Sequence, residues 1–551
     1  MTGSRSVLLS AGQGTVHNHL HGQQRSIQLK RQNPAKLIVA LLIFILCFAL
    51  TVGTYARYGQ YNLDSDMSSD MVLADLLNEE GKIVTTNYYY SGELNILSPI
   101  LVFQVALRLF SSWHVARTVS IGFMILLMTA SLLFLGKSAG ISLPTCLLGA
   151  SALIMPVSKY QAFTLIYGSF YMIWATLTFF ELGLILRMKK KRPLEPILLA
   201  LFGFVGSLSG VRMLMICAAP VIIACVLNFY LEARKVHSLR EMLAVPAFPT
   251  LAGSLICVIS NVAGYLVSTN VLAKTYHFTE FDETVIKKLQ SGMLTDQLRA
   301  VMEFFGYRAE SLLLSTEGLY SLFVIVMPVL GIICIILLLR MKLNAEERLL
   351  AIYTQIALIL GMIINVVVMF DPNDTYFNGY SVSYYMPAAL LMVFSIFWFL
   401  DRFECRQYLL RVLPMILGVS LFVLGFTIYK DQEVNTYDDE MTIIADTILK
   451  EGCTEGYATY WLSNVLTEVS DGKLEVYMVE DWESGKVGDW LQRIDHLSSE
   501  PKGRIFAIYS EDDFNNERPG CDYDRLIYSS PKAYICVYED INEFHKLRGD
   551  Q

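Results

Sequence analysis

Residues 36–75 read KLIVALLIFILCFALTVGTYARYGQYNLDSDMSSDMVLAD, a long apolar run followed directly by an acidic stretch. The run at 36–56 is long enough to cross a bilayer as one helix. It is longer than the apolar core of a signal peptide, and no small-residue cleavage site follows it, so we expect a span that is retained in the protein. Just beyond that span lie four aspartates: Asp64, Asp66, Asp70 and Asp75.

The rest of the chain has the composition of a polytopic α-helical membrane protein. Its 551 residues are 54% hydrophobic and only 17% charged, and apolar runs of membrane-helix length recur along it. With the first run we predict about eleven spans, the others at about 115–136, 141–157, 166–187, 194–208, 212–231, 244–268, 318–339, 348–370, 384–400 and 408–428. Glu181 is the chief charged residue inside a predicted span, and we place it toward the inner half.

A further apolar segment, 94–110, is long enough to raise the question of a twelfth span. Counting it would reverse the side of every later loop and export the basic clusters. With eleven spans, the basic N-terminal tail shares one side with the clusters at 187–192, 232–235 and 340–342, in agreement with the positive-inside rule. We therefore expect 94–110 to lie along the outer surface. The alternative is a true span that is balanced by a re-entrant segment elsewhere.

The chain changes character after residue 430. Residues 431–551 contain 27 Asp and Glu against 11 Lys and Arg, and eleven spans from a cytoplasmic N-terminus place this acidic segment outside the cell. Such a charge would repel nucleic acid, so we expect no nucleic-acid partner. The predicted organisation is a disordered cytosolic tail (1–35), a transmembrane module (36–430) whose outer loop 57–114 bears juxtamembrane helices, and an extracytoplasmic domain (431–551).

Strand-like and helical segments alternate within this last domain, which predicts a small α/β fold on a largely parallel sheet. The expected helices are 437–451, 462–470 and 487–497, and the expected strands are 456–461, 473–479, 504–510 and 533–539.

Cysteine usage adds little to this organisation. Seven of the ten cysteines lie in or beside spans, where we interpret them as small apolar filler. Cys453, Cys521 and Cys536 lie in the exported domain, where one disulfide can form, and we expect Cys453 to pair with Cys521. No spacing of cysteines and histidines indicates zinc.

The opening aspartates allow a structural and a catalytic interpretation. Val72, Leu73, Leu76 and Leu77 recur with helical spacing, so a helix follows the acids and turns this face toward the membrane or the core. Asp64, Ser65 or Asp66 can cap that helix, where acids suit the positive end of the helix dipole. Asp66 and Asp70 would share one face of it, and we interpret Asp70 as structural.

The layout resembles the GT-C class of membrane glycosyltransferases, and in particular its protein O-mannosyltransferase and lipid A aminoarabinose transferase branches. The matching segments are Leu63-Asp64-Ser65-Asp66, Gly92-Glu93-Leu94-Asn95, Ser112-Trp113-His114-Val115-Ala116-Arg117, Tyr384-Tyr385-Met386-Pro387 and GYATYWLSNVLT at 456–467. Two departures stand out. Residues 158–163 (SKYQAF) contain no carboxylate where aminoarabinose-type enzymes have one, and Ser383 stands where the class has an arginine.

The resemblance implies transfer of a sugar from a polyprenyl-phosphate carrier to a glycan, lipid or protein acceptor at the outer face of the cell membrane. Asp66 would then be the general base, with Asp64 as the alternative or assisting acid. For the donor phosphate we look to basic residues at outer span ends, in the order Arg212, Arg117, Lys159 and Lys274. The aromatic residues expected to line a substrate groove, unless they form the interfacial aromatic belt, are Tyr88, Tyr89, Tyr380 and Tyr384.

We expect no cofactor, because one acidic motif supplies few oxygen ligands for a divalent metal; a metal at Asp64 and Asp66 is the less favoured alternative. Two other kinds of function stay open at this point. A transporter or lipid flippase would fit the number of spans, but transporters place ionisable residues near mid-membrane and this chain gathers them outside. A non-catalytic membrane scaffold would leave the opening acids dispensable.

Overall fold

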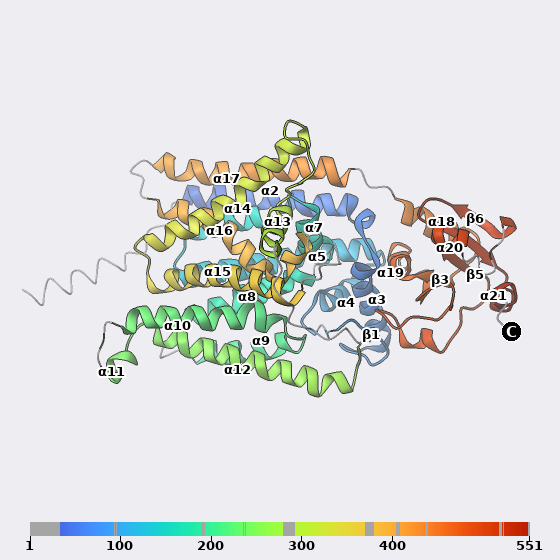
Figure 1. Ribbon diagram of the computed structural model, residues 1–551, viewed down its shortest axis with the longest axis horizontal. Helices are drawn as coiled ribbons and strands as arrows, with labels where there is room; N and C mark the ends of the chain where they lie inside the picture. The colour runs from blue at the N-terminus through green and yellow to red at the C-terminus, as the bar shows by residue number, and fades with distance from the viewer. Residues whose placement is uncertain are drawn as a thin grey trace, which may run out of the picture.

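The computed structural model of this protein describes residues 34–92, 94, 96–168, 170–188, 193–234, 236, 238–278, 292–369, 379–403, 408–435, 439–516, 521 and 523–548. Residues 1–33 of the predicted disordered tail lie outside the described residues. So do Glu93 and Asn95 of the second matching motif. The described chain forms a bundle of long helices that carries a smaller, sheet-containing domain at one end (Figure 1).

The bundle has a helix at each of the eleven predicted spans. These are α2 (Pro34–Tyr58), α5 (Trp113–Ala139), α6 (Leu143–Leu153), α8 (Phe170–Leu186), α9 (Leu194–Ser207), α10 (Ala219–Ala233), α12 (Phe248–Asn270), α14 (Thr316–Arg340), α15 (Ala345–Ile364), α16 (Met386–Arg402) and α17 (Tyr408–Tyr429). Within the described residues, eight helical regions are long and apolar enough to cross a membrane, and a ninth is formed if α8 and the bent segment before it count as one span. α6 and α9, with 11 and 14 residues, are shorter. The number of eleven spans therefore stays a prediction.

Local sequence explains why the shorter helices end where they do. Pro156 follows α6 by three residues and cannot continue a helix. After α9, Gly210 adopts φ +97°, a conformation that favours glycine, and the chain turns back into the π-helical segment η4 (Leu214–Ala218) that leads into α10. This turn places Arg212 between two helices of the bundle.

The segment 94–110 forms the short helix α4 (Pro99–Leu109), which at 11 residues does not reach across a bilayer. Gln104 donates a hydrogen bond of 2.7 Å to the carbonyl of Lys82, and Arg108 donates one of 2.6 Å to the side chain of Asn78. These contacts hold α4 against the loop before it and against the last turn of the helix at Ser65–Glu80. This agrees with a surface helix and not with a twelfth span.

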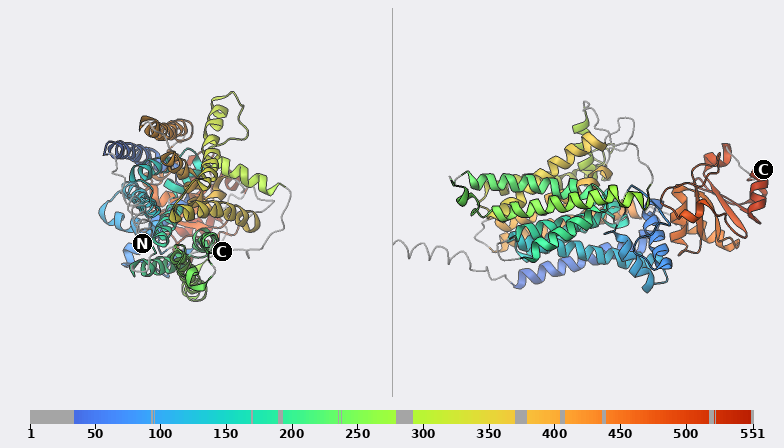
Figure 2. Two further views of the ribbon diagram at one scale, coloured as in Figure 1. Left: turned by 90° about the vertical axis from the view of Figure 1, so that its left-hand side faces the viewer. Right: turned by 90° about the horizontal axis from the view of Figure 1, so that it is seen from below.

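Three outer loops follow from the layout of eleven spans: 57–114, 269–317 and 371–383. Their described residues contact one another toward the end of the bundle that carries the C-terminal domain (Figure 2). β1 (Tyr89–Tyr90) in the first loop pairs in parallel with β2 (His277–Phe278) in the second. In the same second loop, α13 (Met293–Phe304) packs on the 3-10 segment η7 (Gly379–Tyr385) of the third, where Gln297 donates to the Tyr385 hydroxyl at 2.7 Å. We call this the domain-facing end.

The C-terminal domain is an α/β unit, as predicted. Its sheet has the strand order β4 (Glu475–Val479), β3 (Glu455–Thr459), β5 (Ile505–Tyr509), β7 (Tyr534–Tyr538) and β6 (Leu526–Ser529). The first three strands are parallel, whereas β7 and β6 are antiparallel to their neighbours. The helices are α18 (Glu440–Lys450), α19 (Tyr460–Val469), α20 (Glu511–Asn516) and α21 (Ile541–Arg548).

The predicted helix at 487–497 is wrong, because only the 3-10 turn Ile494–Leu497 forms there. The backbone of this segment is engaged elsewhere. The N–H of Tyr89 donates to the carbonyl of Gln492 at 2.8 Å, and the N–H of Ile494 donates to the carbonyl of Asn87 at 3.0 Å. These bonds join the C-terminal domain to the first loop at the expense of a helical hydrogen-bond ladder.

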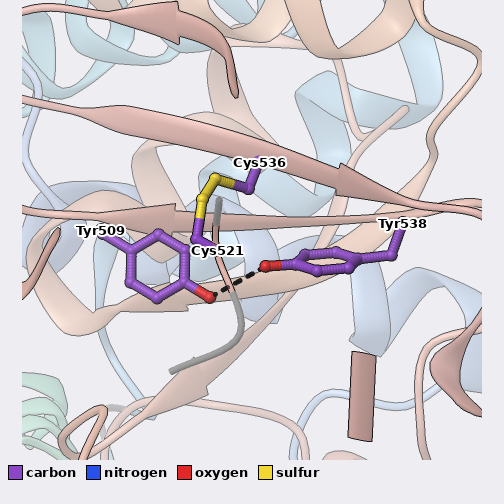
Figure 3. Close-up of a disulfide and its surroundings, with 4 residues drawn as sticks. All are labelled: Tyr509, Cys521, Cys536 and Tyr538. Atoms are coloured by element: carbon purple, nitrogen blue, oxygen red, sulfur yellow. Dashed lines mark hydrogen bonds between the residues drawn. A yellow bond between two sulfur atoms is a disulfide. The ribbon is translucent and has the colours of Figure 1, made fainter. Parts of the chain in front are cut away.

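The expected disulfide between Cys453 and Cys521 is also wrong, since Cys521 pairs with Cys536 (Figure 3). Alternate residues of a strand point to opposite faces of a sheet. Cys536 of β7 packs with Cys521 in the hydrophobic cluster on one face, whereas Cys453 packs in the cluster that also contains Phe506 and Ile535. The sheet therefore separates the two cysteines that we had expected to pair.

Candidate functional site

The acidic stretch folds into α3 (Ser65–Glu80), which lies between the bundle and the C-terminal domain (Figure 1). Asp64 is its N-cap, and the carboxylate accepts a hydrogen bond of 2.9 Å from the N–H of Met67. Gly81 ends the helix at φ +66°. The capping role therefore belongs to Asp64. The apolar face is buried as predicted through Leu73, Leu76 and Leu77.

Asp66, in the first turn of α3, faces the C-terminal domain. The Tyr460 hydroxyl donates to Asp66 Oδ1, and the side chain of Trp490 also hydrogen-bonds this carboxylate. α19 packs directly on α3, and Asn464 donates to the carbonyl of Ser65 at 3.4 Å. The half-buried carboxylate of Asp66 is thus held by two side chains of the C-terminal domain, across the boundary between bundle and domain.

The three aspartates of the first two turns all have raised pKa values. Burial raises the pKa of Asp64 to about 6, against the lowering effect of the Met67 N–H. Burial also raises the pKa of Asp66, while the hydrogen bonds from Tyr460 and Trp490 lower it. Burial raises the pKa of Asp70 to about 7, partly offset by the charge of Arg117. A carboxyl group with such a pKa can accept and release a proton near neutral pH.

Arg117 contacts this site, but its guanidinium is fully buried. Nε and Nη2 donate to the two carboxylate oxygens of Glu468 at 2.5 and 2.7 Å. Nη2 also donates to the carbonyl of Met67 at 2.9 Å, and Nη1 donates to that of Tyr167 at 3.4 Å. Each terminal nitrogen is therefore engaged within the protein. The geometry favours a structural role that ties α5 to α3 and α19 over the predicted phosphate contact.

Arg212 has different surroundings, because aromatic rings frame its half-buried guanidinium. The carbon Cζ lies 5.2 Å from the ring centre of Tyr171, 5.7 Å from that of Trp174 and 5.6 Å from that of Tyr384. Contacts of this kind orient the planar group. Tyr384, predicted from sequence as a groove residue, lies in this cluster.

A short stretch of chain connects the acidic and the basic parts of the site. The backbone carbonyl of Tyr167 accepts the hydrogen bond from Arg117, and Tyr171, four residues later in the sequence, lies against Arg212. The segment that contains Tyr167 and Tyr171 therefore contacts both Arg117 and Arg212.

Lys159 and Tyr380 lie together in a separate group. The Lys159 ammonium is 5.3 Å from the ring centre of Tyr160, and this ring contacts Tyr380 edge to face at 4.7 Å. Lys159 lines a cavity of ≈ 250 Å³ together with Arg299, Glu303, Arg308 and Glu433, among others. This polar cavity has charges of both signs, so it is not a simple anion site.

The remaining predicted residues take different positions. Tyr88 is buried, and its hydroxyl donates to the carbonyl of Ser69 on α3 at 3.3 Å. Tyr89 lies on β1, where its ring is 5.3 Å from that of His277. Lys274 is exposed, three residues before the paired strand β2. Tyr88 thus contacts α3 through its hydroxyl, while Tyr89 and Lys274 belong to the loops that meet beside this helix.

Sequence reasoning missed three residues that surround the acids: Tyr460, Glu468 and Trp490. Tyr460 lies in the segment GYATYWLSNVLT, which already resembled the GT-C class, so a weak signal existed. Nothing in the sequence alone pairs Glu468 with Arg117, because the two residues are 351 positions apart.

Within the described part of the chain, one group of three potential metal ligands of the types His, Cys, Asp and Glu lies close together, and neither Asp64 nor Asp66 belongs to it. Asp64 is engaged as a helix cap and Asp66 accepts from Tyr460. The expectation of a metal-free acidic site therefore stays a prediction, with these contacts in its favour.

A helical membrane bundle, an acidic surface helix after its first span and a C-terminal domain at the same end together define a GT-C fold. No protein-family model matches the sequence, and no curated protein matches it. Solved structures do match. ArnT from Cupriavidus metallidurans bound to undecaprenyl phosphate aligns with a TM-score of 0.58 at 11% identity, over 94% of this chain and 99% of that chain.

The apo state of the same ArnT aligns with a TM-score of 0.56 at 12% identity, over the same shares of the two chains. The oligosaccharyltransferase of Archaeoglobus fulgidus, in its apo form, reaches 0.49 at 12% identity over 89% of this chain and 70% of that chain, which is too weak to argue from. At these identities the ArnT matches show the fold alone. They confirm the GT-C architecture expected from the layout.

Proposed function

We propose that this protein is a membrane glycosyltransferase that moves a sugar from a polyprenyl-phosphate carrier to an acceptor at the cell surface. The observation that carries the proposal is the position of Asp66, a half-buried carboxylate at the start of α3, held by Tyr460 at the domain-facing end of a GT-C bundle. A polyprenyl-phosphate donor is supported by the ArnT structure of similar fold, which is bound to undecaprenyl phosphate.

Asp66 acts as the general base in this proposal. Its carboxylate takes the proton of the acceptor hydroxyl while the acceptor oxygen bonds to the anomeric carbon of the sugar. At the same time the bond from that carbon to the phosphate oxygen breaks, through a transition state with cation-like character on the sugar. The products are the glycosylated acceptor, polyprenyl phosphate and a protonated Asp66. The Asp64 carboxylate, which caps the same helix, sets the position of this turn.

Arg212 holds the donor phosphate. A guanidinium can bind two phosphate oxygens at once, and it stabilises the negative charge that develops as the carrier leaves. The rings of Tyr171, Trp174 and Tyr384 fix its plane before the donor arrives, which lowers the cost of binding. Lys159 and Lys274 are secondary candidates, whereas Arg117 is already paired within the protein.

The acceptor belongs to the class of cell-surface glycans, glycolipids or proteins with a free hydroxyl. The loops that carry Tyr89 and Lys274 meet beside α3 and provide a surface on which such a molecule can dock. No cofactor takes part in the proposed reaction, since base and phosphate ligand are both side chains.

The test is transfer of radiolabelled sugar from polyprenyl-phosphate donors into membrane glycans, lipids and proteins. Wild type is compared with Asp66→Asn and with a matched control, Asp75→Asn, at equal expression. Asp75 lies on the same helix, where its charge interacts with Glu79 and Arg493 and not with Tyr460. We expect transfer to be lost in Asp66→Asn and kept in Asp75→Asn.

Equal transfer by wild type and Asp66→Asn would remove Asp66 from catalysis. If wild type transfers no sugar from any donor, the glycosyltransferase proposal fails, and the transporter or scaffold readings take its place. The folding of each variant is checked by its melting temperature in detergent.

A further inference from the structure

Three helical segments bring Glu181, Cys217 and Cys257 together inside the bundle. Glu181 lies on α8, Cys217 on the π-helical segment η4, and Cys257 on α12. The Cys217 sulfur is 3.5 Å from Glu181 Oε2, and the Cys257 sulfur is 3.3 Å from the same oxygen. All three side chains are fully buried, and their ligand atoms lie within 4.8 Å of one another.

The surroundings of this triad contain no counter-charge. In the described structure, the side chains that interact with it are Asn261, Thr178 and Tyr353, none of which carries a positive charge. An anionic carboxylate or thiolate in such a place would be costly. The triad is therefore either fully protonated or it holds a cation.

A fully protonated triad leaves one oxygen unsatisfied. Both thiols point to Glu181 Oε2, while Oε1 is buried and has no hydrogen-bond partner among the described residues. This holds whether Oε1 is the carbonyl oxygen or carries the proton. The Thr178 hydroxyl, one helical turn from Glu181, is also buried and interacts with the Cys217 thiol. Unsatisfied polar groups of this kind are rare in native proteins and need an explanation.

We propose that Glu181, Cys217 and Cys257 form a binding site for a thiophilic divalent cation of the zinc class. In a tetrahedral zinc site, with metal–sulfur bonds of about 2.3 Å and metal–oxygen bonds of about 2.0–2.2 Å, a sulfur and an oxygen ligand lie about 3.5 Å apart. The two sulfur–oxygen separations in the triad, 3.3 and 3.5 Å, agree with this geometry.

Binding also changes the charge of the proposed site. Metal ligands are deprotonated, so binding releases one proton from each thiol and one from Glu181, and the three anionic ligands together with the divalent cation leave one net negative charge. Glu181 supplies a carboxyl oxygen as the third ligand, and the Thr178 hydroxyl lies next to Cys217, where it can complete the coordination.

The site has a structural role in this proposal, independent of the proposed glycosyl transfer. It clamps α8 to η4 and α12. α8 also contains Tyr171 and Trp174, and Arg212 lies two residues before η4. The metal would thus join α8, which carries two of the three rings around Arg212, to the segment that follows Arg212. The π-helical turn that carries Cys217 is an uncommon element that often marks a functional site.

The test uses the full-length protein, purified in detergent and stripped with a chelator. Zinc is added back, excess is removed, and bound zinc is measured by elemental analysis. Cobalt is added to a second sample, because a cobalt–thiolate site absorbs in the near ultraviolet. We expect about one zinc per chain and a thiolate-to-cobalt absorption band in wild type, and loss of both in Cys217→Ser and Cys257→Ser.

Cys146→Ser is the matched control, since Cys146 is a fully buried cysteine of α6 outside the triad. It should retain both the zinc and the cobalt band. Wild-type protein without bound zinc and without the cobalt band overturns the proposal, and this result does not depend on whether the variants fold. Zinc that persists at the wild-type level in the folded double variant Cys217→Ser, Cys257→Ser overturns it as well.

Discussion

Asp66 takes its surroundings from two parts of the chain, since Tyr460 lies 394 residues after it. The acid comes from α3, whereas the hydroxyl and the indole that hold it come from the C-terminal domain. Burial raises the pKa of Asp66 and the two hydrogen bonds lower it. The strength of the proposed base is therefore set partly by the C-terminal domain.

Tyr460→Phe tests this dependence. The variant removes one hydrogen bond that favours the charged form, so the pKa of Asp66 rises further. A general base works only when it is deprotonated. As the pH is lowered, the variant should therefore lose activity at a higher pH than wild type does. We expect the acid limb of the kcat/KM profile to move to higher pH, with activity approaching that of wild type at high pH. An unmoved acid limb would contradict the assignment of Asp66 as the titrating base.

The helices α3, α5 and α19 are joined by one buried ion pair, Arg117 with Glu468. Two charges removed from water are stable only while each has its partner. The pair therefore couples the bundle to the C-terminal domain. It also explains why the predicted phosphate role does not suit Arg117.

Arg117→Met leaves Glu468 buried without a partner, which should cost about 3–5 kcal/mol of unfolding free energy. Adding Glu468→Leu removes the unpaired buried charge, so we expect the double variant to recover a large part of the lost unfolding free energy. Thermal unfolding in detergent measures both. If Arg117 instead holds the donor phosphate, Arg117→Met would keep its melting temperature and raise the KM for the donor.

The turn between α9 and η4 presents Arg212 to three rings, and this arrangement gives a separate prediction. Arg212→Lys keeps the charge but loses the planar group that stacks and binds two oxygens. A loss of about 1.4 kcal/mol in donor binding corresponds to about tenfold, and we expect at least this rise in the KM for the donor. Arg240→Lys on the short helix α11 (Leu239–Met242) serves as the matched control. An unchanged KM would exclude Arg212 as the phosphate ligand.

At the scale of the whole molecule, features that depend on local composition could be predicted and features that depend on distant pairing could not. Apolar runs place a helix at each expected span, and the acids after residue 60 identify α3. The helix expected at 487–497 is absent, because that backbone bonds to Asn87 and Tyr89. The partner of Cys521 likewise depends on which face of the sheet each cysteine occupies.

The structure shows which loops share an end, and labelling can show which end faces outward. Leu497 in the C-terminal domain is 38% exposed, and Leu239 on α11 at the opposite end is 72% exposed. We expect a membrane-impermeant maleimide to label Leu497→Cys in intact cells and to label Leu239→Cys only after lysis, each compared with the parent chain. The reverse pattern would invert the predicted orientation.

The contact between Tyr460 and Asp66 also bears on the order in which the protein is synthesised. A ribosome completes α3 early and adds Tyr460 only after every helix of the bundle has been made. Throughout that interval, the growing chain has an acid that lacks its hydroxyl donor. A copy terminated by a premature stop codon before Tyr460 would therefore be an inserted membrane bundle with an incomplete site, unable to glycosylate at the normal rate.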